Sequence, residues 1–247
     1  FPTRRSSDLI ILIGTSHISA ESADLVRKTI QEENPDTICI EWDQKRYKKN
    51  IHPDEWDDTD IVKIIKNKQF PVFIFGVIYK LFQKKVSQDM NSLVGKEFVV
   101  AVDESKKLNI KFYLIDRDSS LTFKRAWRML NFREKVKLPY AFGKIFEGAE
   151  ETEEEVQNLL ESENFEPVFE ELKESYPNLW EVFVTERDDY LATKIQNTAN
   201  GKTVAVLGKA HLKGVSDRLK NNQKSDLQKL EIIPPKKFGS KIGRAHV

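Results

Sequence analysis

The sequence predicts an α/β protein in which a central, mostly parallel sheet is flanked by helices, with a large helical insertion between the third and fourth strands. Two observations predict this class. Four short aliphatic runs, apolar on both faces, punctuate a chain whose remaining pattern is charged and helical, and such runs are typical of parallel strands buried between helix layers. The first two runs are joined by one helical segment, which makes a β-α-β unit.

The four strands are expected at residues 10–14, 37–41, 111–116 and 203–208, with the sequences IILIG, TICIE, KFYLID and TVAVLG. A fifth strand is expected at 230–233, where LEII is closed by two prolines. The single cysteine, Cys39, lies inside the second run and cannot form an intramolecular disulfide. This cysteine usage fits a reducing compartment.

A helix is expected between the first two strands. Ser19 is its candidate cap, Leu25, Val26 and Ile30 recur at helical spacing, and the helix stops before Pro35.

The remaining connections are also helical in pattern. Residues 60–108 predict two or more helices with a break at Gly95, including a buried apolar helix at 70–82 that is too short to span a bilayer. A helical block from about 120 to 200 fills the insertion. Its acidic run at 147–156 is typical of a solvated helix face or a linker.

Residues 10–239 predict one domain, and we expect segments 1–9 and 241–247 to be translated sequencing adapter rather than native chain. The 40 Lys and Arg residues balance 39 Asp and Glu residues, so nothing in the charge favours a nucleic-acid partner. We expect this fragment to be soluble and cytoplasmic. The gene product is expected to be longer, and a missing C-terminal region leaves membrane anchoring open. The sequence leaves the oligomeric state unknown.

A Gly-x-x-His motif follows both the first and the fourth predicted strand, as Gly14 to His17 and Gly208 to His211. Each glycine is expected to let the chain turn sharply as it leaves the sheet, which carries the histidine to the start of the next helix. Ligands of open α/β sheets bind beyond the carboxyl ends of the strands. The duplication therefore predicts a shared site, whereas one such histidine alone is typical of a helix cap or a satisfied polar group.

The ends of the second and third strands carry ionisable residues toward the same edge of the sheet. They are Glu41, Asp43, Arg46, Asp116, Arg117 and Asp118. Two structural alternatives stay open. Glu41 forms a salt bridge with Arg46 in the first, and Asp116 and Asp118 cap the helix that begins SSLTFKRAW in the second.

Arg187 breaks a local rule, because it lies within an apolar stripe of a predicted helix. The stripe consists of Trp180, Val184, Leu191 and Ile195. A buried arginine needs a carboxylate or an anionic ligand. The pattern predicts either a structural ion pair with Glu186, Glu41 or one of the aspartates, or an anion-binding group near the edge of the sheet.

Six segments in order resemble the TraB domain of the TraB/PrgY pheromone-shutdown family, whose relatives include GumN-like proteins and the Tiki metalloproteases. They are the first Gly-x-x-His motif, PDTICIEWDQKRY, LVGKEF, IDRDSSLTFKRAW, VTERDDYLATKI and VAVLGKAHLKG, and the similarity covers about residues 10–235. The resemblance implies a metal-dependent hydrolase or peptidase-like site at the two motifs and Glu41, with Arg187 in the family's Glu-Arg motif. Bacterial members reduce the activity of a secreted peptide, and many members carry membrane helices after the domain.

We therefore expect His17, Glu41 and His211 to bind a divalent manganese, cobalt, iron or zinc ion. Such a metal would activate a water for attack on a peptide or a small ester or amide, and Arg187 would bind the developing oxyanion. Asp43 or Asp116 would orient the histidines. The further residues expected around the site are Gly14, Arg46, Arg117, Asp118, Glu186 and Gly208.

Two other functions remain open. One is a protein that sequesters a peptide or small ligand without cleaving it. The other is hydrolysis without metal, with His17 or His211 as the base together with Glu41.

Overall fold

A single parallel sheet forms the centre of the molecule. The structure is a computed structural model that describes residues 9–15, 20–51, 95–131, 133–135, 137 and 173–235. In this part of the chain the strands are β1 (Ile10–Thr15), β2 (Thr37–Ile40), β3 (Lys111–Leu114) and β4 (Thr203–Gly208). All are parallel, in the order β1-β4-β2-β3. The α/β class predicted from the four aliphatic runs is confirmed.

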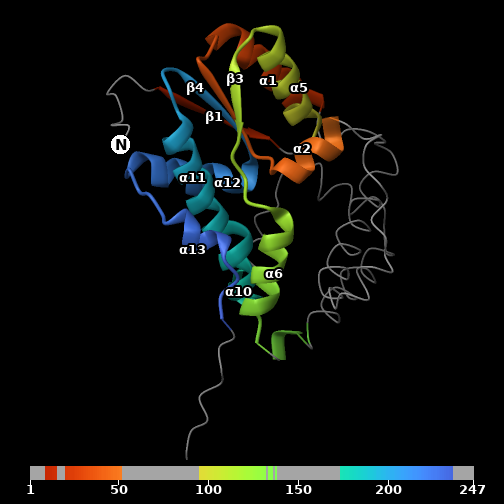
Figure 1. The fold of residues 1–247 in the computed structure, drawn as a ribbon, viewed down its shortest axis with the longest axis vertical. Coiled ribbons are helices and arrows are strands. Elements are labelled where there is room, and N and C mark those ends of the chain that lie inside the picture. The colour runs from red at the N-terminus through yellow and green to blue at the C-terminus, as the bar shows by residue number, and fades with distance from the viewer. Residues whose placement is uncertain are drawn as a thin grey trace, which may run out of the picture.

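Helices cover both faces of the sheet. Their bounds are α1 (Ala20–Glu33), α2 (Gln44–Ile51), α5 (Lys96–Lys107), α6 (Ser119–Met129), α10 (Pro177–Trp180), α11 (Glu186–Thr198), α12 (Lys209–Lys220) and α13 (Leu227–Glu231), with a π-helical turn, η3 (Glu181–Thr185), between α10 and α11. Figure 1 shows α1 and α5 beside one face, α11 and α12 beside the other, and α6 and α10 beyond the lower end of the sheet. Of the described part of the predicted helical insertion, α6 and α10 thus lie beyond the carboxyl ends of the strands, whereas α11 packs on a face of the sheet.

Alternate residues of the central strands fill two separate apolar cores. Ile38 and Ile40 of β2 pack with Val26 and Ile30 of α1 on one face. On the other face, the strands pack against α11 and α12 through a set that includes Cys39, Ala205, Leu207, Leu191, Ile195 and Val215. Because both faces are covered, β2 and β4 are buried along their whole length, which is why their sequences are continuously apolar.

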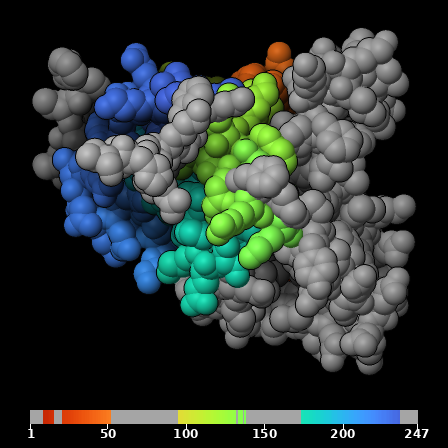
Figure 2. All heavy atoms as spheres, turned by 90° about the horizontal axis from the view of Figure 1, so that it is seen from below, coloured from red at the N-terminus to blue at the C-terminus, as the bar shows by residue number. Residues whose placement is uncertain are grey.

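A third apolar cluster lies below the sheet. Seen from that end, the green surface of α6 meets the cyan surface around α10 (Figure 2). Ala126 and Leu130 pack there against Leu179 and Val182. This cluster fixes the segment that leads into α11.

The first predicted helix forms, with Val26 and Ile30 fully buried, whereas Leu25 is 50% exposed. It ends as expected, because Asn34 adopts a left-handed conformation with φ 39°. Gly95, with φ 83°, directly precedes α5, so a helix begins at the predicted break, and the helix expected before it lies outside the described residues.

The predicted fifth strand at 230–233 is wrong. Its first two residues belong to helix α13, whose N-terminus is capped by Asp226, because Oδ1 of this residue accepts a hydrogen bond of 3.0 Å from the backbone N–H of Gln228. The two isoleucines that suggested a strand, Ile232 and Ile233, are 60% and 41% exposed. The Asp cap before LQKLE was the signal that favoured a helix.

Several predictions concern residues outside the described ranges. They are the Ser19 cap, the apolar helix at 70–82 and the acidic run at 147–156. Among the described helices, none has both the length and the apolar composition needed to cross a membrane.

Candidate functional site

The carboxyl ends of β2, β3 and β4 bring Glu41, Asp116 and His211 together around Arg187. Glu41 directly follows β2, Asp116 follows β3, and His211 lies in the first turn of α12, which begins where β4 ends. Arg187 reaches them from the start of α11. The three side chains are buried. The parallel strands therefore bring these residues to one edge of the sheet, as the sequence predicted.

Arg187 contacts all three of these side chains. Its Nε and Nη2 atoms donate to the two oxygens of Asp116 at 3.2 and 2.6 Å, and Nη2 also donates to Oε1 of Glu41. Its Nη1 atom lies 2.7 Å from Nε2 of His211. The predicted ion pairing of Arg187 with Glu41 and an aspartate is thus present.

The contacts of His211 define its protonation. A guanidinium only donates hydrogen bonds, so the Nε2 atom of His211 accepts from Arg187. The ring proton is then on Nδ1, which lies 2.7 Å from Oδ1 of Asp188 and donates to it. These partners assign a neutral imidazole with the proton on Nδ1. Nε2 also lies 3.7 Å from Oε1 of Glu41.

Opposite charges keep this buried group ionised. Burial acts to raise the pKa of Asp116, but the guanidiniums of Arg187 and Arg46 outweigh it and hold that pKa well below its ordinary value. Burial acts to lower the pKa of Arg187, but Asp116 and Glu41 outweigh it and raise that pKa. The arginines thus stabilise the ionised form of Asp116, and the carboxylates stabilise the charge of Arg187.

Arg46 and Asp43 connect this group to α2. The Oδ1 atom of Asp43 accepts from the backbone N–H groups of Lys45 and Arg46 at 2.8 and 3.0 Å, as a helix cap does. Arg46 pairs with Asp43 and also with Asp116. The salt bridges in this region therefore join Arg46 to Asp116 and Glu41 to Arg187, rather than resting on the Glu41–Arg46 pair considered from sequence.

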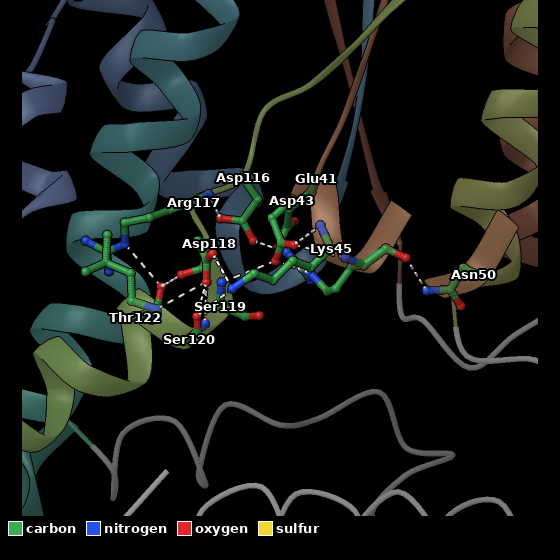
Figure 3. Close-up of polar contacts among 12 residues, drawn as sticks. Glu41, Asp43, Lys45, Asn50, Asp116, Arg117, Asp118, Ser119, Ser120 and Thr122 are labelled. Carbon is green, nitrogen blue, oxygen red and sulfur yellow. Dashed lines mark hydrogen bonds and ion pairs between the residues drawn. The ribbon is translucent and has the colours of Figure 1, made fainter. Parts of the chain in front are cut away.

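Asp118 caps α6, as one alternative predicted. Its Oδ1 atom accepts from the backbone N–H groups of Ser120 and Leu121 at 2.8 and 3.3 Å. Lys45 reaches across from α2 to Asp118 at 2.8 Å, and the backbone of Ser119 donates to Asp43, as Figure 3 shows. These contacts join α2 to α6, whereas Asp116 points to the two arginines instead of capping the helix.

Arg117 and Glu186 belong to a second buried cluster. Glu186 accepts from Arg117 at 2.8 Å and from Arg125 at 2.6 and 2.8 Å. Arg117 also donates to the backbone carbonyl of Leu230 at 3.1 Å. Arg125 donates to the carbonyls of Lys229, at 3.1 Å, and Ile232. These residues hold the C-terminal segment to α6 and α11, a structural role that the sequence did not separate from the site.

Neither motif glycine needs a special backbone conformation. Gly208 has φ −63° and ψ 140°, which any residue adopts, and Gly14 lies within β1. The predicted reason for these glycines, a sharp turn, is therefore not what the structure shows. A Cβ on Gly14 would lie 2.9 Å from Cδ2 of Leu212, so this glycine lets α12 pack closely on β1. The N–H of Gly208 donates to Oε2 of Glu41 at 2.6 Å.

Sequence reasoning missed two buried carboxylates. Asp188, rather than Asp43 or Asp116, is the carboxylate on His211. It precedes the buried Leu191 and Ala192 by three and four positions, so it shares their face of the helix. Glu97, in the segment LVGKEF, is buried beside Thr15 at the end of β1, with 3.4 Å between Oε1 and the Thr15 hydroxyl.

Glu41 and His211 fit a pair of ligands on one divalent metal. With metal–ligand bonds of about 2.0–2.2 Å, adjacent ligand atoms on one ion lie roughly 3–3.5 Å apart, close to the 3.7 Å between Oε1 and Nε2. A histidine that ligates through Nε2 and donates from Nδ1 to a carboxylate is the usual arrangement. For both atoms to bind a metal, Arg187 must release them. Among the described residues no group of three candidate ligands forms a metal site, and His17 lies outside them, so the three-ligand set stays a prediction.

Several known proteins are similar to this chain over most of its length. The chain is 33% identical to an uncharacterised protein of Methanocaldococcus jannaschii over 233 residues, which cover 92% of this chain and 58% of that protein. It is 26% identical to the TraB domain-containing proteins of Mus musculus and Homo sapiens over 266 residues, 96% of this chain and 69% of each relative. The chain thus spans little more than half the length of the archaeal relative.

A family model tests the resemblance seen in the six segments. The model of the TraB/PrgY/gumN family matches residues 3–228. The match includes the strand ends that carry Glu41 and Asp116, together with Arg187 and His211. The chain belongs to the TraB/PrgY/gumN family.

Proposed function

We propose that this chain is a hydrolase that cleaves a peptide or a small ester or amide, and that it uses a divalent metal held by His17, Glu41 and His211. One observation carries the proposal. Glu41 and His211 come from different strand ends, yet Oε1 lies 3.7 Å from Nε2, and Arg187 donates to both of these atoms. Glu41 after the second strand and His211 of the second Gly-x-x-His motif are two of the three ligands expected from the sequence.

The described residues have distinct roles in this proposal. When bound, the metal would supply an activated water and polarise the scissile carbonyl. Glu41 and His211 would hold it, and the N–H of Gly208 fixes the Glu41 carboxylate through Oε2. Arg187 keeps two hydrogen bonds to Asp116 after it releases Glu41 and His211. Its charge therefore stays at the wall of the site, where it stabilises negative charge on a substrate oxygen.

Elemental analysis of the purified protein tests the metal. We expect the wild-type chain to retain a divalent ion, and the His17→Ala, Glu41→Gln and His211→Ala variants to lose it. His52→Ala is the matched control, because it removes a histidine and leaves both Gly-x-x-His motifs intact. Equal metal content in all five proteins would contradict the shared site.

Chelation tests the chemistry. We expect hydrolysis of a fluorogenic peptide library to stop on complete removal of the metal and to return when the ion is restored. Activity that survives removal would instead indicate acid–base hydrolysis by a histidine with Glu41.

The bridging position of Arg187 favours a second candidate function. Its guanidinium forms hydrogen bonds with both Glu41 and His211. This arrangement suits a pocket that binds a ligand without cleaving it. In that case the protein sequesters a peptide or small ligand. Calorimetry would then detect affinity for the ligand, while mass spectrometry would find the ligand uncleaved.

A further inference from the structure

The contact between Asp188 and His211 is buried and specific. Asp188 is 4% exposed, and its Oδ1 atom lies 2.7 Å from Nδ1 of His211. Its second oxygen, Oδ2, lies 3.7 Å from Nη1 of Arg218. The next residue, Asp189, pairs with Nε of Arg218, and within the described residues no hydrogen bond or ion pair joins it to the imidazole. Both carboxylates thus pair with Arg218, and Asp188 is the one that also contacts His211.

Gly214 provides the space that Asp188 occupies. This glycine lies on α12 three positions after His211, and a Cβ there would stand 2.0 Å from Oδ2 and 2.6 Å from Cγ of Asp188. No side chain fits in that space while the carboxylate stays in place. The segment LGKAHLKG thus contains the histidine together with the gap through which its partner reaches it.

We propose that Asp188 is a positioning residue, which keeps the proton of His211 on Nδ1 and holds Nε2, the acceptor of the Arg187 hydrogen bond, beside Glu41, and that Gly214 leaves room for its carboxylate. A carboxylate that accepts from Nδ1–H fixes the tautomer and the ring orientation and makes Nε2 a better ligand. The use of this arrangement in catalysis rests on the proposed function. The hydrogen bond itself does not, so the two are tested separately.

Nitrogen-15 and proton NMR of the histidine rings tests the positioning in metal-free protein. We expect wild-type His211 to show the Nδ1–H tautomer with a downfield, slowly exchanging Hδ1 resonance, because the Nδ1–H group donates to a buried carboxylate. This Hδ1 resonance should disappear in Asp188→Asn and Gly214→Ala and persist in Asp189→Asn, the matched control. Gly214→Ala keeps the carboxylate in the chain, so it tests the position of Asp188 even where Asp188→Asn folds poorly.

A wild-type spectrum with the proton on Nε2 would overturn the proposal. So would an Hδ1 resonance that is unchanged in Asp188→Asn. Either result is read without any assay of hydrolysis.

Calorimetric titration with Zn²⁺ or Mn²⁺ then tests the use of the arrangement. We expect Asp188→Asn and Gly214→Ala to bind the ion about 10–100-fold more weakly than wild type, as loss of a carboxylate behind a histidine ligand does, and Asp189→Asn to match wild type. Equal affinity in Asp188→Asn and wild type would overturn the positioning role. Absence of binding to wild type, with the expected NMR spectra, would instead reject the metal in the proposed function and leave the positioning by Asp188 intact.

Discussion

The Nη1 atom of Arg187 lies 2.7 Å from the Nε2 atom of His211. The same guanidinium pairs with Glu41 and Asp116, so one side chain from α11 neutralises groups at the ends of two strands and contacts a third at the start of α12. Its removal would leave two buried carboxylates short of a partner.

We expect Arg187→Gln to lower the free energy of unfolding by about 3–5 kcal/mol in metal-free buffer, the cost of breaking a buried ion pair by removing one member. Urea unfolding followed by circular dichroism measures this. The control is Lys28→Gln, because Lys28 is 71% exposed and pairs with Glu32, which is 64% exposed. The control should change stability by about 0–1 kcal/mol. If Arg187→Gln is as stable as wild type, the network does not hold the strand ends together.

We expect Glu186→Gln to destabilise the C-terminal segment in particular. Glu186 neutralises Arg117 and Arg125, which in turn donate to backbone carbonyls of Lys229, Leu230 and Ile232. Loss of its charge leaves two buried guanidiniums uncompensated, at a cost of about 3–5 kcal/mol. Hydrogen exchange should therefore accelerate most at α13. The neighbouring Glu181→Gln, on an exposed side chain, should leave exchange there unchanged. Uniform acceleration over the whole chain in Glu186→Gln would contradict a local clamp.

We expect stability to fall on acidification from about pH 5 downward. Burial acts to raise the pKa of Asp116 and of Glu186, but the arginines around each carboxylate outweigh it and lower both values. An unfolded carboxyl titrates at about pH 4, so below that pH the unfolded chain binds protons that the folded chain does not. The stabilisation is thus complete above the unfolded pKa and is lost as the pH falls toward the folded value. Urea unfolding between about pH 3 and 7 should show this slope, and Asp116→Asn should flatten it. A slope unchanged in that variant would exclude Asp116 as a source.

We expect the thiol of Cys39 to be unreactive in the native protein. Burial raises its pKa to about 11, and the thiolate is the reactive form. An aromatic disulfide reagent at neutral pH should modify Cys39 only after unfolding in guanidinium chloride. Rapid modification of the native chain would indicate that the core around β2 opens readily.

The sequence predicted the four strands because a strand covered on both faces must be apolar throughout, as at Ile38, Cys39 and Ile40. It also predicted that Glu41, Asp116 and His211 would meet, since parallel strands deliver their carboxyl ends to one edge. The expected grouping of Arg117 and Glu186 with them was only partly right, because these two residues turn to a second cluster.

Two features of the structure cannot be predicted from the periodicity of apolar residues in the sequence. The π-helical turn at 181–185 shifts the register of the helix, so Val182 rather than Val184 is fully buried. The choice of Asp188 over Asp189 as the partner of His211 depends on the space left by Gly214 on another helix. Neither can be read from the spacing of residues within one segment.

The strand order has a consequence for how the protein is made. In the described sheet β1 lies at an edge and pairs with β4, from Ile10 opposite Thr203 to Thr15 opposite Gly208. Among the described strands, β1 is therefore made long before its neighbour β4, and such distant pairings slow folding. A chain that stops before residue 203 would lack both β4, the neighbour of β1 in the described sheet, and His211. Pairing of β1 and assembly of the groups at the strand ends therefore both depend on the same late segment of the chain.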